Sequence, residues 1–165
     1  MVSGESHYFL GRRYRLRVIE QQGKSTLILR NKAIMELHVR PESDAEQREK
    51  LLQDWYRAQL KALVPELLEK WRLLLDVEVT SWSIRKMKTK WGACNTQARR
   101  FWLNLELAKK PVQCIEYIIV HELTHLLERH HNDRFTALMD KHLSNWRMYR
   151  DELNQAPLGH ESWDR

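Results

Sequence analysis

The sequence has few cysteines and no long apolar run, and both shortages narrow the class of protein. Cys94 and Cys114 are the only cysteines among 165 residues, and no C-x-x-C pair occurs. The N-terminal residues contain no apolar run long enough for a signal peptide, and no segment approaches the length of a membrane span. We therefore expect a cytoplasmic protein with two reduced thiols and no membrane partner.

Glycine-rich phosphate loops are also absent. Neither G-x-G-x-x-G nor G-x-x-x-x-G-K-[ST] occurs, so the ordinary dinucleotide and P-loop folds are unsupported. The sequence does contain 42% hydrophobic residues with seven Trp and five Tyr, which indicates a folded core rather than disorder. A formal net charge of +6 permits an anionic partner without requiring one.

Apolar periodicity predicts an α+β fold, with strands, helices, strands and helices in that order. The expected elements are three short antiparallel strands within 12–39, helices at 44–63 and 65–74, a strand at 76–84, a basic loop or hairpin at 85–100, a strand at 101–107, and helices at 111–128, 131–142 and 145–155. Pro65 is expected to open the second helix. We expect a single domain over 1–165, with its metal-site helices at about 111–155.

The segment 117–135, which reads YIIVHELTHLLERHHNDRF, carries the strongest chemical signal. His121 and His125 are four residues apart, so on a helix they lie one turn apart on the same face. Their imidazoles can hold one Zn²⁺ ion, or another divalent metal, at Zn–N distances of about 2.0–2.1 Å. Glu122 projects beside the pair, where it can act as general base toward a metal-activated water. Two satisfied core histidines and a surface glutamate are the structural alternative, but the apolar surroundings make unpartnered polar groups costly.

The third ligand is open at this point. The candidates are His130, His131, His142, Glu128 and Glu152. Glu128 shares a helix face with His121 but lies two turns along. His131 follows His121 by ten residues, which is the offset of the metzincin pattern H-E-x-x-H-x-x-G-x-x-H, although position 128 is not glycine here. We favour His131, with surface roles for His130 and His142.

Several segments together resemble the YgjP-like metallopeptidase domain family. They are residues 88–94 (KTKWGAC), 103–108 (LNLELA) with Pro111, 121–125 (HELTH) and 131–135 (HNDRF). The resemblance covers about residues 12–155, and Ala93 stands where the family usually has Ser. It implies that His121, His125 and His131 bind the metal and that Glu122 is the catalytic residue. It also implies a compact zincin-like fold, in which a small twisted antiparallel or mixed sheet packs on the H-E-x-x-H helix. The SprT-like and WLM proteases look like more distant relatives.

The resemblance implies a zinc-dependent metallohydrolase, first of all a metallopeptidase that acts on peptide or protein substrates. An alternative proposed for the family is a nucleoside triphosphate pyrophosphatase that hydrolyses phosphoanhydrides such as that of UTP. Phosphoryl chemistry more often uses oxygen ligands with Mg²⁺ or Mn²⁺, which favours the peptidase. A third hypothesis is a DNA-associated protease or binding protein with a structural metal. The motif provides an activated water and does not identify the bond it attacks.

Residues 85–100 hold six basic residues and no acidic one, so they could bind phosphates or a nucleic-acid backbone. A solvated basic hairpin is the structural alternative, and we do not favour a nucleic-acid partner. Candidate substrate-binding residues near this run are Lys88, Lys90, Trp91 and Asn104; a satisfied buried amide is the alternative for Asn104. The strand at 101–107 is a candidate edge for peptide addition. Tyr149 and Arg147 are open candidates for oxyanion stabilisation.

Overall fold

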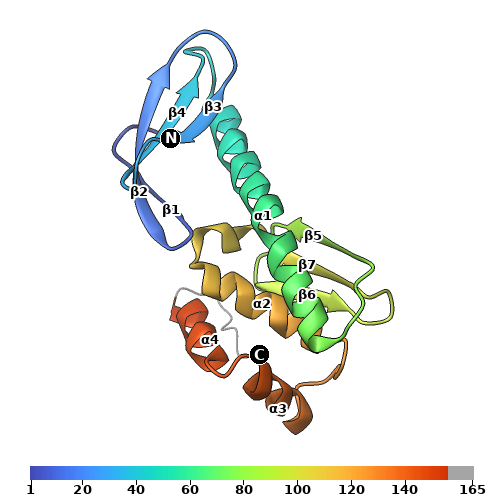
Figure 1. The fold of residues 1–165 in the computed structure, drawn as a ribbon. Coiled ribbons are helices and arrows are strands. Elements are labelled where there is room, and N and C mark those ends of the chain that lie inside the picture. The colour runs from blue at the N-terminus through green and yellow to red at the C-terminus, as the bar shows by residue number, and fades with distance from the viewer. Residues whose placement is uncertain (156–165) are drawn as a thin grey trace. The chain divides into compact units, whose positions relative to one another are not determined.

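The computed structural model describes residues 1–155, which form two compact units (Figure 1). The first unit comprises Met1–Lys61 and Ala108–Pro111, and the second comprises Ala62–Leu107 and the residues from Val112 onward. A single domain over 1–165 stays a prediction, and its last ten positions lie outside the described residues. Within residues 1–155, every helix is too short or too polar to cross a membrane.

The first unit contains a four-stranded sheet. Its strands are β1 (Ser6–Phe9), β2 (Arg12–Glu20), β3 (Thr26–Leu29) and β4 (Ile34–Val39), in the order β1-β2-β4-β3. β2 and β4 pair in parallel, whereas β1 with β2 and β3 with β4 pair antiparallel. The prediction of three antiparallel strands was therefore wrong. The alternation of apolar residues along a strand indicates which face of the sheet each side chain occupies. It does not indicate which strand pairs with that strand.

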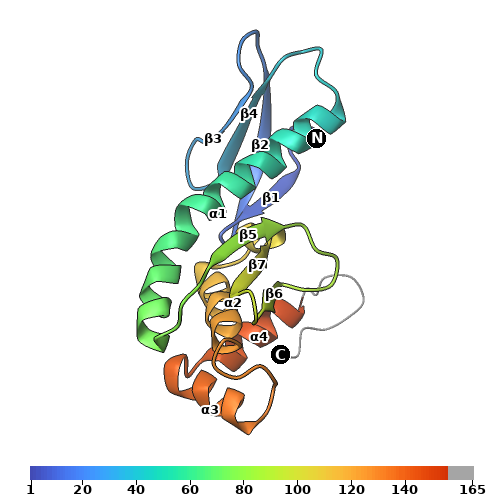
Figure 2. The ribbon, with the colours of Figure 1, turned by 90° about the vertical axis from the view of Figure 1, so that its right-hand side faces the viewer.

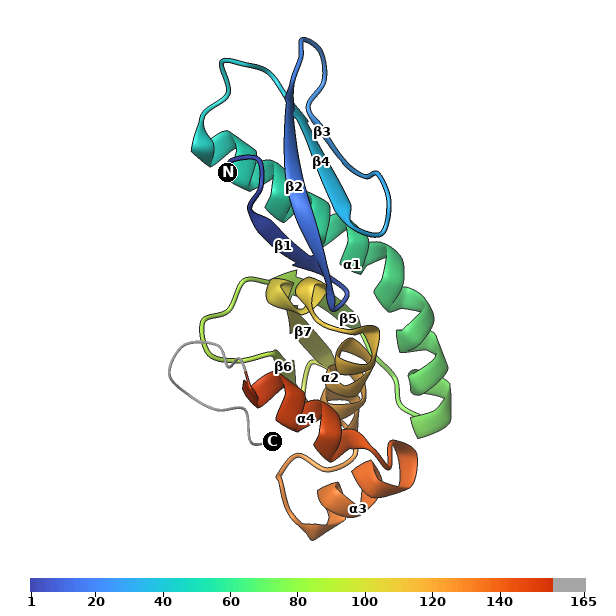
Figure 3. The same ribbon diagram turned by 90° about the vertical axis from the view of Figure 1, so that its left-hand side faces the viewer.

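One face of this sheet is covered by the first half of α1 (Ala45–Leu75), as Figures 2 and 3 show from opposite sides. Alternate residues of the strands point toward that helix, and Leu16, Met35 and Leu37 are almost fully buried. Phe9 packs against Trp55 with ring centroids 4.7 Å apart. The burial of these apolar side chains joins the helix to the sheet within this unit.

α1 is one helix of 31 residues, although a boundary was predicted at Pro65. Asp44 and Gln47 cap its start reciprocally, since each side chain accepts a hydrogen bond from the other residue's backbone N–H. Pro65 lies inside the helix and is exposed. Proline removes the hydrogen bond to the carbonyl of Lys61, and water can solvate that carbonyl because Lys61 is exposed too. The helix therefore continues, and the prediction of two helices was wrong.

The second unit contains a three-stranded sheet in the order β5-β7-β6. Its strands are β5 (Ser81–Arg85), β6 (Gly92–Asn95) and β7 (Arg100–Asn104). The predicted strand at 76–84 begins later, and the predicted strand at 101–107 ends at Asn104, where the 3-10 helix η1 (Leu105–Lys109) follows. β7 is the central strand, so its interpretation as an edge was wrong. The hairpin within the basic run pairs β6 with β7, so β6 is one of the two edge strands of this sheet, with β5 at the other edge.

Three helices complete the second unit: α2 (Val112–Thr124), α3 (Asp133–His142) and α4 (Trp146–Gln155). α2 lies against the sheet, with α3 and α4 beside it (Figure 1). The predicted helix at 111–128 ends sooner, because the backbone tightens after Thr124 into i→i−3 hydrogen bonds such as Leu127 N–H to Thr124 O at 2.9 Å. The predictions at 131–142 and 145–155 are confirmed within a few residues.

Candidate metal centre

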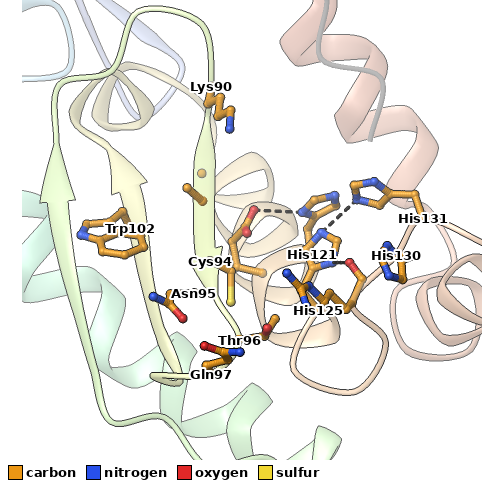
Figure 4. Close-up of a pocket in the computed structure, with 14 residues that line it drawn as sticks. Lys90, Cys94, Asn95, Thr96, Gln97, Trp102, His121, His125, His130 and His131 are labelled. Atoms are coloured by element: carbon orange, nitrogen blue, oxygen red, sulfur yellow. Dashed lines mark hydrogen bonds and ion pairs between the residues drawn. The ribbon is translucent and has the colours of Figure 1, made fainter.

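Three histidines converge at the end of α2. His121 is buried in its last turn, His125 follows directly after it, and His131 is exposed just before α3. One ring nitrogen from each lies within 4.8 Å of the other two. Nε2 of His125 and Nε2 of His131 are 2.9 Å apart, and Figure 4 shows the three rings turned toward one another. The structure therefore brings together the three histidines that the sequence singled out.

Hydrogen bonds from the far side of two rings select the tautomer that a metal site needs. Nδ1 of His121 lies 2.9 Å from a carboxylate oxygen of Glu122. Nδ1 of His125 lies 3.0 Å from the carbonyl oxygen of Arg129. Since both partners are acceptors, each Nδ1 carries the proton and each Nε2 keeps its lone pair. Burial, and then the neighbouring His121, lower the pKa of His125, which keeps this imidazole neutral at neutral pH.

This donor set fits a zinc ion. Three neutral imidazoles are ligands that zinc commonly takes in catalytic sites, where they leave an open position. Zn–N bonds of about 2.0–2.1 Å require donor atoms roughly 3–4 Å apart, which small rotations of these side chains would give. Phe135 of α3 supports the rings, because its centroid lies 4.7 Å from both His125 and His131 and 5.2 Å from His121.

Gly92 makes room for the glutamate of the motif. A methyl group placed on Gly92 would lie 2.9 Å from Oε2 of Glu122 and 2.7 Å from Cγ2 of Ile118. Both distances are shorter than real contacts, so β6 can approach α2 this closely only with glycine at this position. In the sequence, Gly92 stands out only as part of the KTKWGAC segment that resembles the family. Its role depends on the packing of β6 against α2, which one sequence does not reveal.

The histidines open onto a pocket of about 780 Å³ beside β6 (Figure 4). Its lining residues are Lys90, Gly92, Ala93, Cys94, Asn95, Thr96, Gln97, Trp102, His121, Glu122, His125, Arg129, His130 and His131. Cys94 is half-buried, and burial together with the charge of Glu122 raises the pKa of its thiol to about 12. Cys94 is thus protonated at neutral pH, and both cysteines are free thiols.

The other candidate ligands have different surroundings. The carboxylate of Glu128 accepts hydrogen bonds from Asn132 and Arg134. Glu152 accepts one from the thiol of Cys114, 3.5 Å away. His130 lines the pocket, but neither it nor His142 belongs to the metal-ligand group found among residues 1–155.

Of the predicted substrate-binding residues, Lys90 lines the pocket and the other three lie outside its lining. Trp91 is 2% exposed and belongs to the core. The buried amide of Asn104 donates to the carbonyls of Met87 and Lys90 and accepts from the backbone N–H of Glu106. It therefore holds the basic loop in place, as the structural alternative anticipated.

The two candidates for oxyanion stabilisation also lie outside the pocket lining. Arg147 donates to the carboxylate of Asp140 at 2.6 Å, and its guanidinium packs over the ring of Trp146. Tyr149 belongs to the same helix, α4. The side chain of Arg147 is thus engaged elsewhere in the second unit.

Comparisons with known proteins identify a family and a fold. A family described as YgjP-like, metallopeptidase domain, matches residues 1–156. The crystal structure of the metallopeptidase zymogen of Pyrococcus abyssi abylysin is 20% identical, with a TM-score of 0.52 over 56% of this chain and 93% of that chain. That of Methanocaldococcus jannaschii jannalysin, also a metallopeptidase zymogen, is 18% identical, with a TM-score of 0.50 over 56% and 94%. No curated protein matches the chain. The likeness to these two structures shows a zincin-like α+β fold.

Proposed function

Because this chain belongs to the YgjP-like metallopeptidase domain family and is a metal-dependent hydrolase, we propose that it hydrolyses peptide bonds with zinc held by His121, His125 and His131. The observation that carries the proposal is the convergence of three imidazole nitrogens within 4.8 Å beside a buried carboxylate. When bound, the ion supplies Lewis acidity, which lowers the pKa of a water and polarises the scissile carbonyl.

Glu122 is the proposed general base. It is 2% exposed and belongs to the pocket lining, so its carboxylate borders both the histidines and the space for substrate. Its hydrogen bond to Nδ1 of His121 orients the carboxylate. A carboxylate in this position can take a proton from the attacking water and later deliver it to the leaving amine. Gly92 keeps that position free of a side chain.

The edge strand β6 is the proposed platform for the substrate backbone. Within the described part of the chain, β6 pairs with β7 and its other edge is unpaired. The pocket lining includes all four β6 residues as well as the three histidines. An extended peptide that paired with this edge would therefore pass the metal site, which is the β-strand addition used in many peptide complexes.

Two alternatives have less support. Of the six basic residues in 85–100, Lys90 alone lines the pocket, so a phosphate-binding surface formed by the whole run does not face the histidines. A structural metal usually has four protein ligands, whereas the group within residues 1–155 comprises three histidines. Both observations favour an open site for peptide hydrolysis over a nucleotide substrate or a DNA-binding module.

Metal analysis and peptide profiling test the proposal. The purified zinc-loaded protein is incubated with a mixed peptide library, and the products are identified by mass spectrometry. We expect cleavage of peptides that a chelator abolishes and added zinc restores. The Glu122→Gln variant should lose this cleavage, whereas Glu78→Gln, the control at an exposed glutamate, should retain it. His121→Ala, His125→Ala and His131→Ala should lose bound zinc, and His130→Ala should keep it. Full zinc retention in His121→Ala, or cleavage of ribonucleoside triphosphates in place of peptides, would contradict the proposal.

A further inference from the structure

The pocket beside the histidines has two unpaired cations in its lining. Lys90 and Arg129 are both exposed and both line the pocket. Within residues 1–155, neither side chain forms an ion pair or a hydrogen bond, although their backbone carbonyls accept from Asn104 and His125. By contrast, the nearby Arg134 is paired with Glu128. Two charges without partners in one pocket are available to a ligand.

One buried carboxylate opposes these two positive charges. Glu122 is the one acidic residue in the lining, and it is 2% exposed. Its carboxylate already accepts a hydrogen bond from His121. Apart from Lys90, Arg129 and Glu122, the lining consists of uncharged polar, aromatic and imidazole side chains with glycine, alanine and cysteine. The accessible part of the pocket therefore has a positive potential, which favours anionic groups.

The positions of the two cations suit an extended peptide. Lys90 lies two residues before the first residue of β6, at one end of the edge strand, as Figure 4 shows. Asn95, Thr96 and Gln97 line the pocket at the other end of β6. Arg129 is near the metal site, because its carbonyl accepts the hydrogen bond of His125 at 3.0 Å. A peptide along β6 would meet Arg129 near the scissile bond and Lys90 a few residues away.

We propose that this peptidase prefers acidic substrates, and that Arg129 recognises an Asp or Glu side chain near the scissile bond and Lys90 one a few residues away. The proposal rests on the peptidase function above and names its substrate class. Exposed lysine and arginine pairs with carboxylates are individually weak, so each contact should change affinity by only about 1.5- to 5-fold. Acting together, and strengthened by long-range attraction, they should give acidic peptides roughly a tenfold advantage over matched basic peptides at low salt.

Matched peptides test the preference directly. We would measure kcat and KM of the zinc-loaded protein on one cleaved sequence whose flanking residues are all Glu, all Gln or all Lys. The Glu peptide should have the lowest KM, with similar kcat for all three, and added salt should reduce the difference. Lys90→Gln and Arg129→Gln should each raise KM for the Glu peptide alone. Lys86→Gln, which removes an exposed lysine outside the pocket lining, should leave KM unchanged.

Charge reversal distinguishes recognition from a general structural effect. The double variant Lys90→Glu with Arg129→Glu should prefer the Lys peptide, whereas damage to the fold would slow all three peptides equally. Equal KM values for the three peptides would overturn the inference while leaving the peptidase function intact. If no peptide is cleaved, fluorescence anisotropy with the labelled Glu peptide tests binding alone. Binding that depends on Lys90 and Arg129 would support the preference for an acidic ligand, although the peptidase function would have failed. Tighter binding of a nucleoside triphosphate through the same two residues would overturn the inference.

Discussion

Among residues 1–155, each of the two units buries one glutamate, and the two carboxylates have different surroundings. Glu36 of β4, in the first unit, is 3% exposed, and Glu122 of α2, in the second, is 2% exposed. Arg30, Arg17 and His38 all contact the carboxylate of Glu36. These partners, above all the hydrogen bonds from Arg30, hold the pKa of Glu36 at about 2. Among the described side chains, the carboxylate of Glu122 has one hydrogen-bond partner, the imidazole of His121.

The difference separates a structural carboxylate from one suited to chemistry. A carboxylate surrounded by guanidinium groups is held in its ionised form, which makes it a poor proton acceptor. A carboxylate that borders an imidazole and an open pocket can exchange a proton with a water there. Burial alone therefore does not identify a catalytic glutamate; the charge and exposure of its neighbours do.

The largest expected effect is the loss of activity when Glu122 is neutralised. Glu122→Gln should lower kcat for peptide hydrolysis by about 10²–10⁴-fold, because the amide cannot accept the proton of the attacking water. Glu36→Gln should leave kcat near that of the unchanged protein. Steady-state kinetics on one cleaved peptide would test both variants. Comparable losses of kcat in the two variants would abolish the distinction between the two carboxylates.

A methyl group on Gly92 should have the next largest effect. Gly92→Ala would place a carbon 2.9 Å from Oε2 of Glu122 and displace the carboxylate, so we expect kcat to fall by about tenfold to a hundredfold. Zinc content should stay close to one ion, since the three histidines are not the crowded groups.

The double variant Gly92→Ala with Ile118→Leu identifies the cause of that loss. Leucine lacks the Cγ2 atom that lies 2.7 Å from the added carbon. If crowding of Glu122 causes the loss, kcat should stay low in the double variant. Recovery of full kcat would instead assign the effect to the packing of Ile118.

The pH dependence of the melting temperature should show how much the ionised side chain of Glu36 contributes to stability. The pKa of Glu36 in the folded protein, about 2, is below the ordinary value of 4.5. Its contribution is therefore fully present above about pH 4.5 and is lost as the pH falls toward 2. Glu36→Gln should melt at a lower temperature than the unchanged protein at neutral pH, and the difference should shrink below pH 4.5. A difference that stays constant down to the lowest pH would show that ionisation of Glu36 is irrelevant to stability.

The smallest expected effect concerns the thiol beside Glu122. Because the pKa of Cys94 is about 12, its alkylation by iodoacetamide at neutral pH should be slow in the folded protein and faster after unfolding. Glu122→Gln removes one cause of the raised pKa, so Cys94 should react somewhat faster in that variant. Peptide mapping by mass spectrometry distinguishes Cys94 from Cys114. Equal rates of Cys94 alkylation in the folded and the unfolded protein would contradict the raised pKa of this thiol.

The local parts of the site could be predicted from the sequence because they depend on spacing along one element. His121 and His125 are one helical turn apart wherever the helix packs. The ten-residue offset from His121 favoured His131, and the family resemblance pointed to the same residue. The start of α1 directly after Asp44 also follows from local capping chemistry. These features need no knowledge of which elements lie side by side.

The remaining features depend on contacts between distant segments, and the sequence does not contain these in readable form. The role of Gly92 arises because β6 packs against α2, and the sequence indicated only a loop or hairpin there. Likewise, β3 pairs with one edge of β4, and β2 pairs in parallel with the other edge. The sequence does not indicate which strand takes which edge. The continuation of α1 through Pro65 depends on the exposure of that side of the helix.

Anomalous diffraction at the zinc edge from zinc-loaded crystals would test the central claim most directly. We expect one strong peak at bonding distance, about 2.0–2.1 Å, from a ring nitrogen of each of His121, His125 and His131, with the Glu122 carboxylate facing the ion's open side. A peak bound elsewhere, or a zinc ion enclosed by four protein ligands with Glu122 turned away, would contradict the account.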